Sequence, residues 1–282
     1  MMRLSPASPV CGIRVEGLDV RDLTAADQPR FVDLLHDNKI VVVPGQALGP
    51  DDLLRFGSMF GLLQHHVLQQ FTLPGYPQLF VLSNEVVDGR PLGHANEGFG
   101  WHTDMSYMRQ PTAYTMLYAL KVPAVGGATW FTDTQAAWDA LPEERKALVR
   151  GRFARFSYGR MYGARTGATP LTPEQRARTP DILHPIVRRH PVTGRHSLYL
   201  GGIEVAGVSG MADEDGVALM KDLLAFATRP ERVFRHEWKP GDLVIWDNRG
   251  LLHTATEYDR SRYTRTLYRT SIEGEVPQGW AA

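Results

Sequence analysis

Apolar and polar residues alternate in many short runs along the chain, most clearly after residue 79. Runs of this length, rich in β-branched and aromatic residues, are typical of β-strands. Strands are expected over Cys11–Val20, Ile40–Val43, Leu79–Ser83, Tyr114–Val122, Thr129–Thr132, Ile186–Arg189, Ser197–Leu200, Val233–Trp238, Leu243–Trp246 and Thr264–Ile272. The segment Pro191–Gly194 has the composition of a turn and is expected to join two of them.

A smaller number of segments carry the spacing of amphipathic helices. The expected helices are Thr24–Asn38, with three apolar residues on one face, then Asp51–Phe60, Thr134–Arg150 and Asp213–Thr228. Many short strands with a few helices favour a mainly β sandwich or jelly roll with helices packed outside. Because no repeat or obvious linker interrupts the pattern, we expect a single domain over residues 1–282. The stretch from Ser157 to Asp181 is long for a connection, so it is expected to be a functional lid or partly disordered.

The overall charge excludes some classes of function. The chain has 31 basic and 31 acidic side chains, and such a neutral chain argues against non-specific nucleic-acid binding, which depends on neutralising phosphates. A single cysteine, Cys11, allows neither an internal disulfide nor a cysteine metal cage. No apolar run resembles a signal peptide or approaches the roughly 18 residues of a membrane span. These features predict a cytoplasmic protein without a membrane partner.

Candidate chemistry begins at His102 and Asp104, which are two residues apart in Trp101–Asp104. In an extended segment such residues point to the same side, so both can reach one ion. This short pattern also arises by chance, but His253 follows a second apolar run about 150 residues downstream. Two histidines and one carboxylate form the facial triad that holds Fe(II) and leaves positions open for other ligands.

Two arginines strengthen the metal hypothesis. Arg265 and Arg269 lie four residues apart in an expected strand, whose period of two places both on one face with Leu267. Two arginines buried without partners would be unfavourable, whereas two anions near the metal would satisfy them. A planar guanidinium suits bidentate binding of a carboxylate. The alternative is a solvated basic strand face, as expected for Arg260 and Arg262 upstream.

Together these residues resemble the taurine/2-oxoglutarate dioxygenase family, the TauD/TfdA group, over roughly Val10 to Ile272. Besides His253 and the arginine pair, the matching segments are Trp101–Asp104, Gly126–Thr129, His184–Pro191 with Gly194, and Gly241–Arg249. The resemblance implies a double-stranded β-helix, a cupin-like jelly roll. It also implies the cofactors Fe(II), 2-oxoglutarate and O2, with release of succinate and CO2 as a small anionic substrate is hydroxylated. Family members commonly self-associate, so a homo-oligomer is expected.

The resemblance also assigns roles to individual residues. Fe(II) would be held by His102, Asp104 and His253, which are then the catalytic residues. Thr129 and Arg265 match the residues that bind the distal carboxylate of 2-oxoglutarate, and Arg269 matches the one that meets the acidic group of the substrate. Ala128 departs from the family, in which an aspartate often precedes the threonine, but the threonine itself is kept.

Weaker candidates surround these positions. Residues that could contact the substrate are His65, His66, Asn96 and Tyr107. Residues of the possible lid that offer apolar and aromatic walls are Tyr158, Met161 and Tyr162. For each of them, ordinary packing or a solvated loop is the competing explanation.

Two alternative functions use the same three ligands. A zinc hydrolase would activate a water molecule, but the chain has no HExxH helix and no obvious general-base glutamate, and the paired arginines would have no purpose. A non-catalytic jelly-roll binding domain would be expected to have lost a ligand. The sequence also contains no G-x-S-x-G, Walker A or G-x-G-x-x-G motif, which argues against serine hydrolases and nucleotide enzymes.

Overall fold

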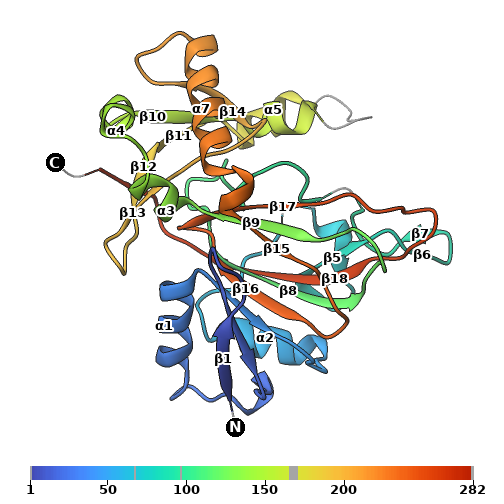
Figure 1. The fold of residues 1–282 in the computed structure, drawn as a ribbon. Coiled ribbons are helices and arrows are strands. Elements are labelled where there is room, and N and C mark those ends of the chain that lie inside the picture. The colour runs from blue at the N-terminus through green and yellow to red at the C-terminus, as the bar shows by residue number, and fades with distance from the viewer. Residues whose placement is uncertain (1, 67, 96, 165–170, 281–282) are drawn as a thin grey trace.

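The computed structural model describes residues 2–66, 68–95, 97–164 and 171–280. Its largest element is an eight-stranded sheet in the order β1 (Arg3–Pro6), β2 (Ile13–Glu16), β3 (Ile40–Val43), β16 (Leu243–Asp247), β8 (Thr112–Lys121), β18 (Thr266–Glu273), β5 (Tyr76–Ser83) and β4 (Thr72–Leu73). A three-stranded sheet, β15 (Val233–His236), β9 (Thr129–Asp133) and β17 (Leu251–Ala255), lies along it (Figure 1).

The two sheets share a buried core. Phe131, Phe234 and Leu251 of the small sheet pack with residues of the large sheet, which include Trp246 and Leu267. This packing produces the mainly β jelly roll with outer helices that the sequence predicts.

The central strands of the large sheet are buried on both faces. All four residues of β3 have no exposed surface, which explains why Ile40–Val43 is a continuous apolar run. Ile40 and Val42 point into the core between the sheets, whereas Val41 and Val43 point into a second core. Successive residues of β16 alternate in the same way.

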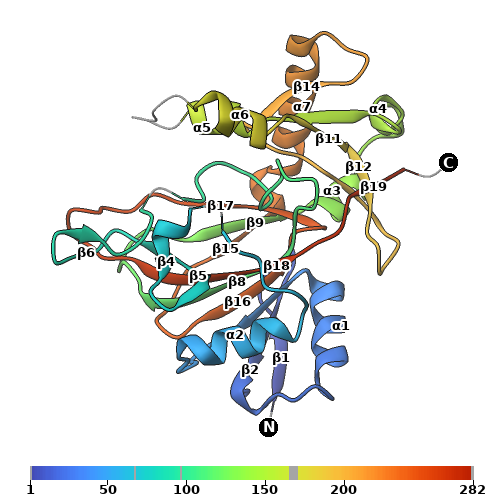
Figure 2. The same ribbon diagram turned by 180° about the vertical axis from the view of Figure 1, so that it is seen from behind.

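Two helices, α1 (Gln28–Asn38) and α2 (Pro50–Ser58), cover the second core on the outer face of the large sheet (Figure 2). The expected start of the first helix at Thr24 is wrong. The Thr24 amide and hydroxyl both donate to the Asp27 carboxylate, which closes a turn, and α1 begins after it with Pro29 in its first turn. The helix ends at Asn38 and is capped by Lys39, whose φ is +65°.

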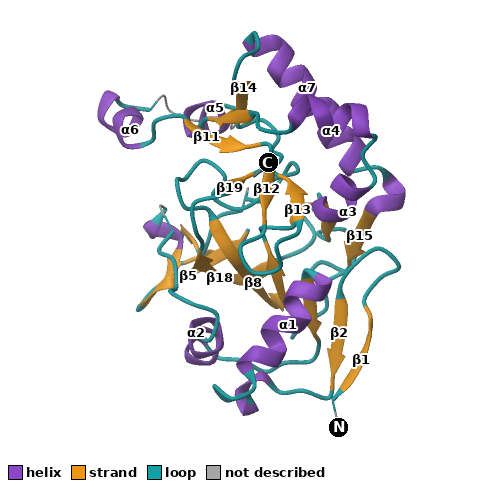
Figure 3. Cartoon of the chain, turned by 90° about the vertical axis from the view of Figure 1, so that its left-hand side faces the viewer, coloured by secondary structure: helices purple, strands orange, loops and turns teal. Residues whose placement is uncertain are grey.

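A further layer lies beyond the small sheet (Figures 1 and 3). It contains α3 (Thr134–Asp139), α4 (Glu143–Val149), β10 (Phe153–Phe156), β11 (Ile182–Pro185), β14 (Val205–Val208) and α7 (Asp213–Ala227), packed around a third core. The single helix expected over Thr134–Arg150 is therefore two helices. Pro142 explains the break, because a proline disfavours helical geometry in the residue before it.

Smaller predictions have mixed outcomes. The Pro191–Gly194 turn joins β12 (Val187–Arg189) to β13 (His196–Leu198), as expected, and β19 (Gln278–Gly279) pairs with β12. The strand expected over Cys11–Val20 is shorter, because only Ile13–Glu16 pairs and a 3-10 helix starts at Val20. A two-stranded hairpin, β6 (Val86–Val87) and β7 (Arg90–Pro91), projects from the large sheet.

The expected lid region contains two short helices, α5 (Tyr158–Gly163) and α6 (Pro173–Arg178), on either side of residues 165–170, which lie outside the described residues. Ser157 caps α5 by accepting a hydrogen bond from the Arg160 amide. Within the described chain, no helix is long and apolar enough to cross a membrane.

Candidate metal centre

His102 and His253 lie opposite each other as a short antiparallel pair. The amide of His102 donates to the carbonyl of His253 at 3.0 Å, and the reverse bond measures 2.9 Å. His253 itself is fixed by β17, where it lies opposite Phe131 of β9. The segment around His102 therefore pairs with β17 through this single antiparallel bridge. The centroids of the two imidazole rings lie 4.2 Å apart.

Asp104 completes the cluster. Its Oδ1 lies 3.8 Å from His102 Nε2 and its Oδ2 lies 3.7 Å from His253 Nε2. One donor atom from each residue lies within 4.8 Å of the others. The His102 Nδ1 is 2.7 Å from the Gly100 carbonyl, so it must carry the proton and leaves Nε2 free as a ligand atom. The donor set therefore fits a divalent metal of the type that prefers imidazole and carboxylate ligands.

Protonation states also favour metal binding. Burial lowers the pKa of His253 to about 3, with the nearby His102 as a second cause, so its imidazole is neutral at physiological pH. Burial raises the pKa of Asp104, but His253, Arg269 and His102 together outweigh that effect and hold it at about 2. A neutral imidazole and an ionised carboxylate are the forms that bind metals.

A second layer of hydrogen bonds orients Asp104. Its Oδ2 accepts from the Thr115 hydroxyl at 2.6 Å, and Thr115 in turn accepts from Asn248 Nδ2 at 2.9 Å. The Asn248 side-chain oxygen accepts from the Trp246 indole at 3.1 Å. These residues belong to two adjacent strands, β8 and β16, and to the turn that follows β16. Residues behind the ligands thus fix the direction of the carboxylate.

Met105, the residue after Asp104, has a φ of +55°. This left-handed conformation is uncommon for a residue with a side chain. It turns the chain immediately after Asp104. The Met105 side chain lines a cavity that His102 and Asp104 also line.

Arg265 lies just before β18 and is almost completely buried. Its Nε donates to the Gly127 carbonyl at 3.1 Å, and its backbone amide donates to Asn84 Oδ1 at 2.9 Å. Burial lowers the pKa of Arg265 to about 10, so the guanidinium remains charged at neutral pH. Within the part of the chain that the structure describes, no carboxylate forms an ion pair with Arg265. A buried guanidinium of this kind favours a bound anion.

Thr129, the first residue of β9, lies beside Arg265. Both line a small cavity of about 30 Å³ together with His102, His253 and Arg269. The Thr129 oxygen accepts a hydrogen bond from the Trp238 indole at 2.9 Å, which leaves its own proton available to an acceptor in that cavity. Gly127 permits this close approach, because a Cβ there would lie 2.7 Å from Pro123 and 3.3 Å from Arg265 Cδ.

Arg269 lies further along β18, on the same face as Arg265. Its NH1 is 3.8 Å from Asp104 Oδ1, and its guanidinium carbon lies 4.7 Å from the centre of the Phe80 ring. Leu267 between the two arginines is buried in the core between the sheets. Both arginines therefore lie on one face of this segment, and both line the small cavity with His102 and His253.

A larger cavity of about 360 Å³ opens in front of His102 and Asp104, and it shares Glu97, Gly98, His102 and Arg269 with the smaller one. Its other walls are mostly apolar or aromatic: Leu68, Phe99, Trp101, Met105, Tyr107, Tyr158 and Met161. The size and lining are those of a small-molecule site.

The weaker sequence candidates are distributed unequally. His66 and Tyr107 line the large cavity, and the Tyr107 ring packs 4.8 Å from Tyr158 of α5. The structure does not bring His65 to the cavity, because its side chain is exposed and its Nε2 lies 3.4 Å from Gln78. Asn96 lies outside the described residues. Of the possible lid residues, Tyr158 and Met161 line the cavity, and Tyr162 stacks on Tyr158 at 5.8 Å.

Sequence reasoning did not identify several residues of this site. Glu97, Ser106 and Glu204 also line the large cavity, and Thr115 and Asn248 support Asp104. Asn248 lies in Gly241–Arg249, one of the segments that resemble the family, and this resemblance was the only sequence feature that pointed to it. Glu204 follows two glycines in an irregular loop, where no periodicity points to a site.

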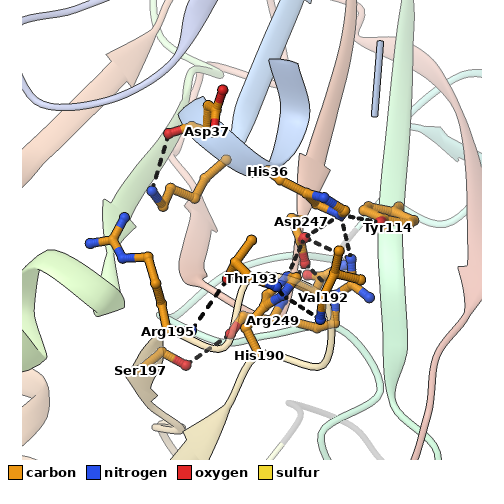
Figure 4. Close-up of polar contacts among 12 residues, drawn as sticks. His36, Asp37, Tyr114, His190, Val192, Thr193, Arg195, Ser197, Asp247 and Arg249 are labelled. Atoms are coloured by element: carbon orange, nitrogen blue, oxygen red, sulfur yellow. Dashed lines mark hydrogen bonds and ion pairs between the residues drawn. The ribbon is translucent and has the colours of Figure 1, made fainter. Parts of the chain in front are cut away.

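A second cluster of two histidines and an aspartate lies between α1 and the sheet: His36, His190 and Asp247 (Figure 4). It already contains a cation. Arg249 donates to both carboxylate oxygens of Asp247 at 2.8 Å each, and His190 Nε2 donates to Oδ2 at 2.9 Å. The His190 Nδ1 accepts backbone amides of the turn that follows it. The guanidinium therefore occupies the position that a metal would need, and this cluster is a structural network.

Comparisons with known proteins agree with the geometry. The model of the family "Taurine catabolism dioxygenase TauD, TfdA family" matches residues 3–271. The chain is 34% identical over 283 residues to an alpha-ketoglutarate-dependent 2,4-dichlorophenoxyacetate dioxygenase of Cupriavidus pinatubonensis, covering 96% of this chain and 98% of that one. It is 35% identical over 246 residues to pentalenolactone F synthase of Streptomyces arenae, covering 82% and 81%.

Solved structures show the same relationship. The structure of AAD-2 in complex with Mn(II) and N-oxalylglycine has a TM-score of 0.81 at 28% identity, covering 99% of this chain and 100% of that one. A taurine dioxygenase from Burkholderia xenovorans has a TM-score of 0.81 at 26% identity, covering 99% and 91%. The expected cupin-like jelly roll is confirmed, as is the expected class of oxidoreductase, which uses Fe(II), 2-oxoglutarate and O2. The chain belongs to the TauD/TfdA family of 2-oxoglutarate-dependent dioxygenases.

Proposed function

We propose that His102, Asp104 and His253 hold the Fe(II) and that Arg265 and Thr129 bind the distal carboxylate of 2-oxoglutarate. The observation that carries this proposal is the buried guanidinium of Arg265, which has no carboxylate partner among the described residues and shares a cavity with Thr129 and two metal ligands. An anion with two ends, one on the metal and one on Arg265, satisfies both charges. A zinc hydrolase would leave this arginine without a purpose.

The chain's own residues then prepare the reaction. Bound Fe(II) supplies the activation of O2 and the oxidative decarboxylation of 2-oxoglutarate to succinate and CO2. Arg265 fixes the far end of the co-substrate, and Thr115 holds the Asp104 carboxylate in a constant direction. The protein contributes orientation and electrostatics, and the apolar walls of the large cavity exclude water from the reacting groups.

The prime substrate is a small organic acid with an apolar body. Arg269 would bind its acidic group, because this guanidinium lines the large cavity close to the metal ligands. Aromatic side chains such as Tyr107, Tyr158 and Phe99 would contact the body. Relatives carry names of the same chemical kind, such as the (S)-phenoxypropionate/alpha-ketoglutarate-dioxygenase of Sphingobium herbicidovorans. Hydroxylation of a C–H bond near the anion would follow from this placement.

The test is Fe(II)-dependent conversion of 2-oxoglutarate into succinate in the presence of a panel of phenoxyalkanoates, alkanoates and sulfonates. We expect succinate release that needs Fe(II) and rises with an acid of the panel. Ester or amide hydrolysis by zinc-loaded protein, without succinate from iron-loaded protein, would contradict the proposal. Homo-oligomerisation and a cytoplasmic location stay predictions from the sequence.

A further inference from the structure

Glu204 is a buried carboxyl group in the wall of the large cavity, and the proposed chemistry does not use it. It precedes β14, and the residue is 3% exposed. Its Oε1 accepts from the Ser106 hydroxyl at 3.3 Å, and its Oε2 accepts from the Gly202 amide at 3.1 Å. Both partners line the same cavity.

The local structure is built to turn this side chain inward. The Gly201 position has no room for a side chain, because a Cβ there would lie 2.5 Å from Glu204 Oε1 and 2.8 Å from Phe156. The Glu204 carbonyl accepts from the Ser157 amide at 2.8 Å, which anchors the turn to the start of α5. The carboxyl is therefore held against the cavity by the backbone.

The hydrogen-bonding capacity of Glu204 is only partly used. A carboxylate offers about four acceptor positions, and the bonds from Ser106, from the Gly202 amide and from the residue's own backbone amide leave room for a further donor. Among the residues that the structure describes, no lysine or arginine forms an ion pair with Glu204. Burial is the main cause that raises its pKa. Hydrogen bonds and the charge of His102 oppose that effect. A desolvated carboxyl without a lysine or arginine partner favours a ligand that brings a hydrogen-bond donor.

The large cavity carries groups of both charge types, which suits a ligand with an acidic group and a hydrogen-bond donor. Arg269 supplies a cation close to the metal, whereas Glu97 and Glu204 add two carboxylates to the walls. The His94 Nδ1 lies 3.6 Å from Glu97 Oε1. An acid that also carries a donor group can therefore use both kinds of charge in one cavity.

We infer that Glu204 is a specificity-determining residue that binds a hydrogen-bond donor, an ammonium or hydroxyl group, on the substrate. This inference rests on the proposed function, in which Arg269 binds the acidic group of the same molecule. Sites built to bond a substrate donor discriminate strongly against analogues that lack it, because their own polar group is then left buried and unpaired.

Binding to protein loaded with Mn(II) and N-oxalylglycine tests the inference without depending on turnover. The probes are matched acids: phenoxyacetate against its 4-hydroxy and 4-aminomethyl derivatives, and pentanoate against 5-hydroxypentanoate and 5-aminopentanoate. Titration calorimetry should show at least one donor-bearing acid binding about tenfold or more tightly than its plain counterpart, the gain typical of a hydrogen bond to a charged group.

Two substitutions locate the effect. Glu204→Met should remove the preference by weakening the donor-bearing acid alone, whereas a residue that only stabilises the loop would weaken both acids equally. Glu204→Gln keeps an acceptor without the charge, so it should retain the preference for a hydroxyl and lose the preference for an ammonium. The control is Glu144→Gln, which removes an exposed carboxylate of α4 that lines neither cavity and should leave the preference intact.

The failures are distinguishable. If N-oxalylglycine does not bind in a Mn(II)-dependent manner, the proposed function is wrong. If N-oxalylglycine binds but every donor-bearing acid binds no better than its plain counterpart, or if Glu204→Met leaves the preference intact, the role of Glu204 is wrong and the proposed function stands.

Discussion

His102 and His253 exchange both backbone hydrogen bonds, at 3.0 and 2.9 Å, although 150 residues separate them in the sequence. This pairing fixes the distance between two metal ligands through the backbone, so neither imidazole depends on a flexible loop for its position. Asp104 lies two residues after His102, and the positive φ of Met105 turns the chain directly after it. β-sheet pairing therefore sets the spacing of two of the three proposed metal ligands.

The first prediction concerns the metal ligands. His102→Ala and Asp104→Ala should abolish Fe(II)-dependent succinate formation, because each removes one of three ligands and leaves an incomplete facial set. Calorimetry with Mn(II) should show a parallel loss of metal binding. The control is His65→Ala, an exposed histidine outside the cavity, which should retain both properties. Near-normal turnover in either ligand variant would contradict the assignment.

The second prediction separates the two arginines. Arg265→Gln should raise the KM for 2-oxoglutarate, and Arg269→Gln should raise the KM for the prime acid, each by an amount that corresponds to roughly 2–5 kcal/mol for a desolvated charge pair. The two variants are compared with each other: Arg265→Gln should raise the KM for 2-oxoglutarate more than the KM for the acid, and Arg269→Gln should do the reverse. If the effects are exchanged, the two roles must be exchanged as well.

The third prediction concerns the buried network of Asp247. Asp247→Asn should reduce the free energy of unfolding by about 3–5 kcal/mol, because it removes the buried carboxylate that accepts two hydrogen bonds from Arg249 and leaves only the longer contact of 3.6 Å to the partly exposed Glu275. Urea unfolding measures this change. The matched control is Asp139→Asn, which breaks an exposed pair with Arg195 and should change stability by about 0.5 kcal/mol or less.

The same network predicts the metal content. Because Arg249 already fills the space between His36, His190 and Asp247, one Mn(II) should bind per chain, and the Asp139→Asn control should bind the same amount. Two equivalent metal ions per chain would show that this interpretation of the second cluster is wrong.

The fourth prediction is a pH dependence of stability. Burial lowers the pKa of His184 to about 4, although a hydrogen bond of 2.9 Å to the Met108 carbonyl opposes that shift. The unfolded chain then binds a proton below pH 6.5 that the folded chain does not. The contribution of His184 to the free energy of unfolding is therefore fully present above about pH 6.5. It is lost as the pH decreases to about 4, and the loss amounts to roughly 3 kcal/mol.

Urea unfolding of wild type and His184→Gln at pH 7 and pH 4.5 measures the contribution. The glutamine keeps a hydrogen-bond donor but does not titrate, so the variant should lose less stability than wild type between the two values. Equal losses in the two proteins would mean that His184 does not contribute to the acid sensitivity.

The local sequence was sufficient for the residue types and for most strands. Ile40–Val43 is buried on both faces, and only a continuous apolar run can form such a strand, which is why it was predictable. The two-residue period also placed Arg265 and Arg269 on one face correctly. Helix ends were less predictable, because the start of α1 depends on a side-chain bond from Thr24 to Asp27 and the break before α4 depends on Pro142.

The sequence by itself determined which side chains could bind a metal and two anions, since those are properties of residue type and spacing. Only the tertiary structure shows which histidine pairs lie beside a carboxylate and which of these clusters has space for a metal. His36, His190 and Asp247 have the same composition as the metal cluster, but Arg249 folds into them. The tertiary structure also places His66 and Glu204 in the wall of the large cavity, whereas His65 does not line it. Such outcomes depend on contacts between distant segments, and a local pattern contains no information about which segment will lie opposite.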